Sequence, residues 1–408
     1  ISSFLSQFQS SIWLLVSSKS IKVLQATTKT IRNVLLSITR YSRADLQPAL
    51  VFLKQLCTRL LSFGSAIRVY TSMILLDVLI RIAPNFFLNS VLLLFQTITD
   101  VADKANLHIK STAFATLASL SIVDKQVFVD SIVEEICPIS PDIIKYYPQD
   151  VLRGLETMLE SIPEFMKTKL PELKQIVVQL FENENGQTYS LRLFSSIFTT
   201  FKEETLPIDQ TLLHKLANLP FSEYYTAFFS NFTKIKSVLS EYKEICDLVV
   251  EKVEHEIEGE NSALTLKFIS QLPPEIFSNN VRRIVEGIYH NSRSNDVETR
   301  RQVPSAIYNI SLICKPEDVE KMRLQLMQSG VNDEDPRVRK AVLVVLEKNC
   351  IKAFAKPEYI KFLQIFVNDD SQRCREIGFR IISNLAKYNP LQISAITRCS
   401  MLDYFFTL

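Results

Sequence analysis

The chain has 408 residues, of which 47% are hydrophobic and 22% charged, a balance that supports a large buried core and excludes intrinsic disorder. Only 7 residues are Gly, against roughly 29 in an average chain of this length, so tight β-turns and phosphate-binding loops are disfavoured. The 46 basic and 44 acidic side chains leave a formal charge of +2. A net charge this small produces too weak an electrostatic field to attract nucleic acid or an anionic membrane. Proteins are therefore the expected partners.

The seven cysteines are widely spaced and form no C-x-x-C pair, which indicates reduced thiols in a cytosolic or nuclear compartment. The longest apolar runs, 73–80 and 91–95, are shorter than the roughly 18–20 residues of a membrane-spanning helix, so we predict no transmembrane segment. The chain begins at Ile1 without a signal-peptide pattern and ends at Leu408 in an apolar segment without a helix stop. We expect it to be part of a longer protein.

In chain order, amphipathic helical patterns follow one another almost from end to end, and no run has the alternation of a strand. Short polar or Pro-containing breaks separate them at 83–85, 138–141, 163–164 and 272–275. A helical chain of this length is too long for one compact bundle, which predicts a repeating arrangement.

An aliphatic residue followed by Arg or Lys opens many of the helical patterns. The basic members are Arg32, Arg68, Lys110, Arg153, Arg192, Lys267 and Arg339, with weaker copies at Arg301 and Arg375. Apart from one double step, they are 34 to 43 residues apart, which suits helical hairpins of the HEAT type. We therefore predict an all-α fold, an α-solenoid of HEAT/armadillo-type hairpins, with residues 1–408 as one continuous superhelix in which neighbouring repeats bury each other's apolar faces.

Two polar stretches are candidate interruptions of this solenoid. An internal break is expected near 182–187, which contains Gly and joins two helical patterns, and a second near 290–296. Both stretches also fit loops within one solenoid. The best-defined repeats lie in 291–408.

In these C-terminal repeats an Asp precedes each basic position, at Asp296, Asp333 and Asp369. Such an Asp can accept hydrogen bonds from the free N–H groups that start the second helix of a hairpin, where Pro336 needs no donor. The Arg one turn later can pair with the Asp of an adjacent repeat and form a ladder along the stack. The structural motif predicted on this basis is Asp333, Pro336, Val338, Arg339, Asp369 and Arg375, with ligand binding by the same residues as the alternative.

Residues with chemical potential are few. The glycines form no phosphate-binding pattern, the four histidines are isolated, and the Glu-rich segment 251–258 reads as a solvated helix face. We interpret the acidic residues at 369–370 and 333–335 as helix caps rather than acid–base pairs. Cys374 lies between two arginines, and we interpret it as a structural cysteine of the repeat rather than a nucleophile. We predict no catalytic residue, cofactor or metal.

The aromatic segment 221–232 is the one candidate partner surface. If exposed, its rings would supply binding anchors, although helical spacing favours a buried core. The candidates are Phe221, Tyr224, Tyr225 and Phe228.

The segment Gly330-Val-Asn-Asp-Glu-Asp-Pro-Arg-Val-Arg339 resembles the motif Gly-Ile-Thr-Asp-Pro-Asp-Pro-x-Ile-Arg in the N-terminal HEAT region of target of rapamycin (TOR) kinases. The similarity continues without a gap to Leu408, through Val342-Leu343, Leu346, Asn368-Asp369, Arg375-Glu376, Leu385, Asn389 and Pro390. Asn332 and Glu334 replace the family's Thr and Pro, and Arg373-Cys374 replaces an acidic–aliphatic pair. The resemblance covers about a fifth of the chain and implies a divergent member.

The resemblance implies that the parent protein is a serine/threonine kinase of the phosphatidylinositol-3-kinase-related class, with this chain as its non-catalytic scaffold in nutrient and growth signalling. It implies protein subunits of a TOR-like complex as partners, including a Raptor-like regulatory subunit, and dimerisation through the full-length chain. It also implies a cytoplasmic location, with partners drawing the protein to endomembrane surfaces. The alternatives are a HEAT-repeat adaptor or transport or coat scaffold unrelated to a kinase, and a helical enzyme whose site is built from distant residues.

Overall fold

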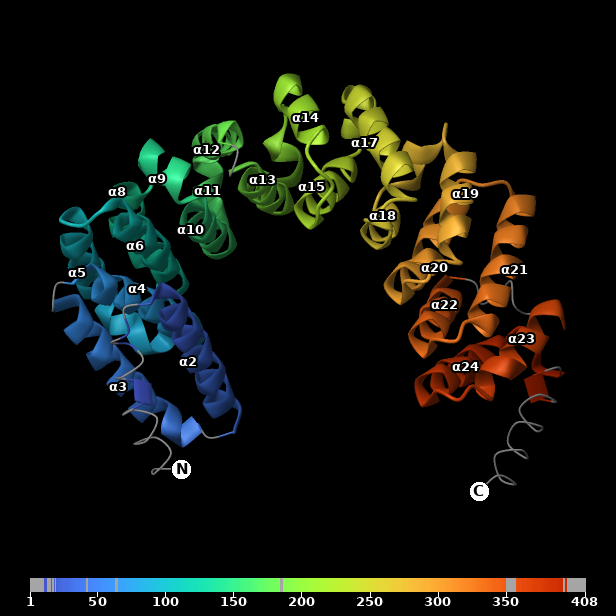
Figure 1. Cartoon of the computed structure of the whole chain (residues 1–408), viewed down its shortest axis with the longest axis horizontal. Helices are drawn as coiled ribbons and strands as arrows, with labels where there is room; N and C mark the ends of the chain where they lie inside the picture. Colours follow the sequence, from blue (N-terminus) through green and yellow to red (C-terminus); the bar gives the residue numbers. More distant parts are fainter. Residues whose placement is uncertain are drawn as a thin grey trace. The chain divides into compact units, whose positions relative to one another are not determined.

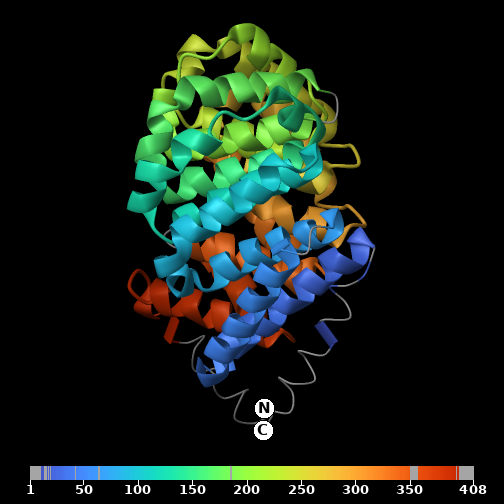
Figure 2. The same cartoon turned by 90° about the vertical axis from the view of Figure 1, so that its left-hand side faces the viewer.

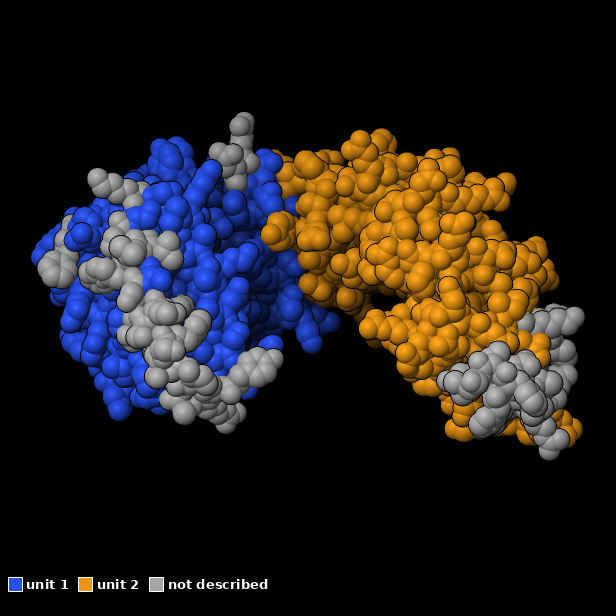
Figure 3. All heavy atoms as spheres, turned by 60° about the horizontal axis from the view of Figure 1, so that its bottom comes forward, with its two compact units in different colours: residues 1–208 blue, residues 209–408 orange. Residues whose placement is uncertain are grey.

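The computed structural model describes residues 11–12, 16, 18, 20–41, 43–62, 65–183, 186–349, 357–391 and 393–394. All regular structure in these residues is helical, and no strand occurs among them (Figure 1). The predicted all-α class and solenoid architecture are confirmed. The chain divides into two compact units, Ile1–Ile208 (unit 1) and Asp209–Leu408 (unit 2), coloured separately in Figure 3.

Unit 1 is built from two layers of helices, visible in Figures 1 and 2. In its first layer, α2, α4, α6, α10 and α13 each pack on the next, and α3, α5, α9 and α12 of the second layer cover them. The elements are α2 (Ile21–Tyr41), α3 (Arg43–Ser62), α4 (Ala66–Ile82), η1 (Pro84–Ser90), α5 (Val91–Asp103), α6 (Leu107–Ser119), η2 (Leu120–Ile122), α7 (Lys125–Ser131), α8 (Val133–Ile136), α9 (Pro141–Tyr146), α10 (Pro148–Ser161), α11 (Pro163–Thr168), α12 (Leu170–Glu182), α13 (Gln187–Phe201) and η4 (Lys202–Thr205).

Unit 2 repeats the same two-layer plan. Its first layer is α15, α18, α20, α22 and α24, each packed on the next, and α17, α19, α21 and α23 form the second layer. The elements are α14 (Gln210–Ala217), α15 (Glu223–Thr233), α16 (Val238–Glu241), α17 (Lys243–Glu256), α18 (Ser262–Ile269), η5 (Pro274–Phe277), α19 (Val281–Asn291), α20 (Val297–Ser311), α21 (Pro316–Asn332), α22 (Pro336–Asn349), α23 (Pro357–Val367) and α24 (Gln372–Leu385).

The core of each unit lies between successive first-layer helices. In α22, Val338, Val342 and Leu346 recur at four-residue spacing and are all buried, because this spacing places them on one helix face. The second helix of the hairpin approaches closely at Gly330 of α21, where an added Cβ would lie 2.6 Å from Cγ1 of Val342. Glycine at this position therefore allows α21 and α22 to pack together.

The two polar stretches are connections inside the units. The stretch 182–187, of which residues 184–185 lie outside the described residues, joins α12 to α13 in unit 1. The stretch 290–296 joins α19 to α20 in unit 2. The continuity of one solenoid over residues 1–408 stays a prediction.

The aromatic segment does not form the partner surface proposed for it. Phe221, Tyr225 and Phe228 are buried, and Tyr224 is half-buried. The rings of Phe221 and Tyr225 lie 5.7 and 6.2 Å from the ring of Phe268, centroid to centroid. The neighbouring first-layer helix α18 thus covers these rings, and they are core rather than exposed anchors.

The stretch Pro84–Asp103, which joins η1 and α5, has the length and hydropathy that a membrane-spanning helix needs. The sequence prediction considered only uninterrupted apolar runs and did not identify this stretch. Leu94, Phe95 and Ile98 of α5 are buried, whereas Leu92 and Leu93 are exposed. Because the buried side chains belong to the core of unit 1 and α5 packs on α6, this stretch is a layer element of the solenoid in this structure.

Candidate functional site

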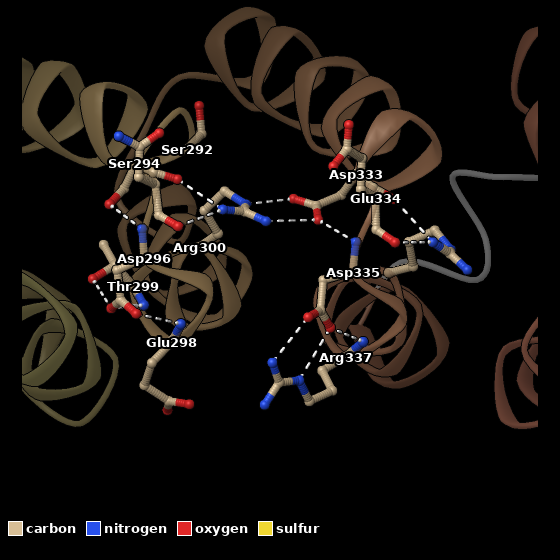
Figure 4. A network of polar contacts seen from close by, with 12 residues as sticks. Ser292, Ser294, Asp296, Glu298, Thr299, Arg300, Asp333, Glu334, Asp335 and Arg337 are labelled. Atoms are coloured by element: carbon tan, nitrogen blue, oxygen red, sulfur yellow. Dashed lines mark hydrogen bonds and ion pairs between the residues drawn. The ribbon is translucent and has the colours of Figure 1, made fainter.

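Arginine–aspartate pairs connect the first-layer helices α20, α22 and α24. Figure 4 shows the first pair, in which Nε and Nη2 of Arg300 donate to Oδ2 and Oδ1 of Asp333 at 2.8 and 3.1 Å. Arg339 on α22 makes the same contact with Asp369, at 2.7 and 2.9 Å. A bidentate pair fixes orientation as well as distance. Each arginine therefore clamps the loop that precedes the next first-layer helix; we call these pairs the ladder.

The same arginines also hold the loop before their own helix. Nη1 of each arginine donates to the two backbone carbonyls five and six residues earlier. These carbonyls belong to Ser294 and Asn295 for Arg300, Asp333 and Glu334 for Arg339, and Asp369 and Asp370 for Arg375, at donor–acceptor distances of 2.6 to 3.3 Å. Three consecutive repeats thus share one arginine geometry. In the first of them the arginine is Arg300 and not Arg301, the position from which the spacing in the sequence was counted; Arg301 pairs with Glu298 instead.

The aspartates organise the loops that the arginines clamp. Oδ1 of Asp333 accepts the backbone N–H of Asp335 at 2.9 Å, and Oδ1 of Asp369 accepts that of Ser371 at 2.8 Å. In the preceding repeat Asp296 caps α20 by accepting the backbone N–H of Thr299 at 2.9 Å. Each carboxylate therefore contacts the backbone at the start of a first-layer helix, where N–H groups lack intrahelical partners.

The remaining motif residues lie at helix boundaries or in the core. Pro336 is the first residue of α22, and Val338, two residues later, is buried. After α24, the backbone N–H of Asn389 donates to the carbonyl of Leu385 at 3.0 Å, and Pro390 starts the next helical residues. The part of the resemblance at residues 350–356, 392 and 395–408 lies outside the described residues.

Burial distinguishes the second ladder pair from the surface ion pairs. The side chains of Arg339 and Asp369 are only 9% and 5% exposed. Burial acts to raise the pKa of Asp369, but hydrogen bonds from Arg339 and from the Ser371 N–H outweigh it, and the pKa lies below its ordinary value. The hydrogen bond to Asp369 in turn raises the pKa of Arg339. Both groups are therefore charged at neutral pH.

Unit 1 also links first-layer helices through arginine, in both directions along the chain. Nε and Nη2 of Arg192 on α13 donate to the carboxylate of Glu156 on the preceding α10, at 2.8 and 2.7 Å. Arg81 on α4 pairs with Asp77 within its helix and donates to Thr157 of α10. The basic positions recognised in the sequence therefore join repeats in both units, with different partners.

Among the described residues, no group of three or more His, Cys, Asp or Glu side chains is arranged to hold a metal ion. Cys374 is buried, and burial raises its pKa. Burial likewise raises the pKa of Cys57 to about 12, so both thiols are poor nucleophiles at neutral pH. The carboxylates of Asp333 and Asp335 bind Arg300 and Arg337. Cys350 and Cys399 lie outside the described residues.

Comparison with known proteins supports the fold over most of the chain and a kinase relationship over a small part. No protein-family model matches. The serine/threonine-protein kinase tor1 of Schizosaccharomyces pombe is 34% identical over 87 residues, which are 21% of this chain and 4% of that protein. Yeast importin-β (Kap95p) has a TM-score of 0.56 and 13% identity over 94% of this chain, and a chain of Kap95p with RanGDP has a TM-score of 0.54 and 13% identity over 94%. The chain covers 52% and 53% of those two chains.

These likenesses show a helical-repeat solenoid, the architecture of proteins that present long surfaces to other proteins. Because the sequence identity is only 13%, these likenesses assign no transport role to any residue of this chain. The match to tor1 covers a small share of both proteins.

Proposed function

We propose that this chain is a non-catalytic scaffold region of a TOR-like serine/threonine protein kinase. The observation that carries the proposal is the 34% identity with tor1 over 87 residues. The motif at 330–339 adds to it, because its Asp333 and Arg339 are the residues that the structure places in the ladder. A repeat motif that resembles the family's motif in sequence, and whose residues make contacts between repeats, is stronger support than helical periodicity alone.

The scaffold acts by holding its repeats in fixed orientation while leaving both layers accessible to partners. In a solenoid each repeat contacts only its neighbours, so the remaining surface is available for binding. The ladder limits rotation of one repeat against the next at Arg300–Asp333 and Arg339–Asp369. We propose that regulatory and substrate-recruiting subunits, including a Raptor-like subunit, bind this surface in a dimeric, cytoplasmic complex that partners bring to endomembranes.

The test is to tag the full-length parent protein in its source cells and purify it under mild conditions. The proposal predicts serine/threonine kinase activity in the tagged polypeptide and copurification of a Raptor-like subunit. A full-length polypeptide without a kinase domain, or one without kinase activity and such a subunit, would overturn it. A kinase-inactive variant made in the domain downstream is the control for contaminating kinases.

The alternative is a HEAT-repeat adaptor or transport or coat scaffold unrelated to a kinase. Kap95p, which shares the fold over 94% of this chain, binds Ran. The two functions are separated by measuring binding of RanGTP and RanGDP to the purified chain. Saturable binding of Ran, together with a parent protein that lacks a kinase domain, would favour the transport alternative.

A further inference from the structure

A groove of about 690 Å³ crosses the first layer of unit 1. It is lined by residues of α2, α4, α6, α10 and α13 and by the connection before α10. Its volume is within the range of ligand pockets, and its lining combines charged, polar and aromatic side chains with the apolar Ile74, Val78 and Pro148. The groove is independent of the ladder, which lies in unit 2.

A row of planar side chains forms the floor of this groove. The ring centroids of Tyr70 and His108 are 4.7 Å apart, and those of His108 and Tyr147 are 5.2 Å apart with nearly parallel planes. Nε2 of Gln25 donates to the hydroxyl of Tyr70 at 3.5 Å, which extends the row to α2. Three successive first-layer helices and the connection before α10 thus each contribute one planar group, with the hydrogen-bonding groups of Gln and Tyr along the row.

The charge of the groove is predominantly positive. Lys29 and Arg32 are exposed on α2 and make no ion pair with any described residue. Arg153 lies at the α10 side, 3.3 Å from Asp150 and 3.8 Å from Asp77 of α4, and its Nε and Nη2 atoms donate no hydrogen bond. The carboxylate of Asp150 is already occupied, since it also accepts the Ser111 hydroxyl at 2.8 Å. The three cations are therefore only partly neutralised.

We propose that this groove binds an extended polypeptide segment rich in Asp and Glu, an inference that rests on the scaffold function proposed above. Successive packed helices are about 8–10 Å apart, so each step from one helix to the next across the groove corresponds to about three residues of extended chain. Peptide N–H and C=O groups match the donors and acceptors of Gln25 and the tyrosines, and acidic side chains match Lys29, Arg32 and Arg153.

Two other ligand classes fit less well. An amphipathic helix needs a continuous apolar groove, whereas the apolar lining here is limited to Ile74, Val78 and Pro148 among charged and hydroxyl-bearing side chains. A nucleic-acid strand carries a negative charge at every nucleotide. The groove crosses five helices but is lined by only three cations and one carboxylate, too few positive charges to match such a strand. An acidic peptide, with charges at intervals, suits this sparse pattern.

The experiment measures binding of a labelled peptide to the whole 408-residue chain by fluorescence anisotropy. The peptide has about 12 residues, long enough to cross the groove, and Glu alternates in it with Ser and Tyr. The comparison probes are the same peptide with Lys replacing Glu and an oligouridine of equal length. Lys29→Glu/Arg32→Glu reverses the charge of one groove wall. Arg59→Glu/Lys104→Glu makes the same charge change at exposed positions of second-layer elements. Circular dichroism establishes that both variants remain folded.

The proposal predicts that the wild-type chain binds the acidic peptide saturably and that this binding weakens with salt. The affinity should fall at least about tenfold in Lys29→Glu/Arg32→Glu and change less than about twofold in the control variant. His108→Ala is expected to weaken binding about threefold or more by interrupting the ring row. Equal binding of the basic peptide, tighter binding of oligouridine, equal loss in the control, or no saturable binding by the folded chain would overturn it. None of these results affects the kinase test, which depends on activity and copurification.

Discussion

Arg339 and Asp369 lie 30 residues apart on successive repeats and meet through two parallel hydrogen bonds, with both side chains less than a tenth exposed. Because removal of one partner leaves the other charge buried, the pair is more sensitive to truncation than a surface ion pair. Its position before α24 makes it a link between repeats as well as a local contact.

Truncation of Arg339 is expected to destabilise unit 2. Arg339→Ala should lower the free energy of unfolding by about 3–5 kcal/mol, because the Asp369 carboxylate loses its cation in a buried site. Denaturant unfolding followed by circular dichroism measures the change. Arg337→Ala is the control, since Arg337 forms a pair with Asp335 that leaves its own side chain 65% exposed. Equal midpoints for the two variants would show that burial of the Arg339 pair is unimportant.

The ladder predicts a specific acid sensitivity. The pKa of Asp369 is lowered in the folded chain, because hydrogen bonds from Arg339 and Ser371 outweigh the raising effect of burial. A carboxyl with a lowered folded pKa stabilises the fold above its unfolded pKa, near 3.9, and this stabilisation is lost as the pH falls through the folded pKa.

We therefore expect the unfolding midpoint of the wild-type chain to fall on acidification below about pH 4. Asp369→Asn should unfold more easily at neutral pH and show a shallower pH dependence. The measurement is a series of denaturant titrations from neutral to acidic pH. A variant with the full wild-type pH dependence would contradict the role assigned to Asp369.

Leu343 tests the burial of the α22 face. Its side chain is fully buried, so Leu343→Ala should destabilise the chain by about 2–5 kcal/mol through a cavity. Leu324 is 40% exposed on α21, and Leu324→Ala should have a much smaller effect. Thermal unfolding of both variants is the measurement, and a neutral Leu343→Ala would place this residue outside the core.

Gly330 tests the close approach of α21 and α22. An added methyl would lie 2.6 Å from Val342, so overpacking of about 1–3 kcal/mol should exceed the gain of up to about 1 kcal/mol in helix propensity. Gly330→Ala should be destabilising in the wild-type chain and less so when combined with Val342→Ala, which makes room.

Gly259→Ala is the matched control for that experiment, because the nearest atom to its added Cβ is 3.5 Å away. It should leave the unfolding midpoint nearly unchanged. If Gly330→Ala is equally harmless, or if Val342→Ala gives no relief, the tight contact between the two helices is not present in solution.

Much of the fold could be predicted from the positions of proline. The predicted breaks correspond to starts of helical elements at Pro84, Pro141, Pro163 and Pro274, since proline lacks the N–H that the first turn leaves free. The motif residues Asp333 and Arg339 could be identified because the same chemistry recurs at a regular spacing.

Other features depended on contacts that spacing does not encode. Helical periodicity favoured a buried face for the aromatic segment 221–232 but did not show that α18 covers Phe221 and Tyr225. The pairing of Arg192 with the preceding helix has the same local sequence signature as forward pairing. The groove residues Tyr70 and His108 belong to no motif, and only the packing of α4 on α6 brings their rings together.

The central claim is that the ladder couples one repeat to the next, and a double-mutant cycle on Arg339 and Asp369 tests it most directly. Arg339→Met, Asp369→Leu and the double variant are compared with the wild-type chain by denaturant unfolding at neutral pH. We predict a coupling energy of about 2–3 kcal/mol, with the double variant more stable than the sum of the single changes implies. Additive effects, within about 0.5 kcal/mol, would contradict the claim.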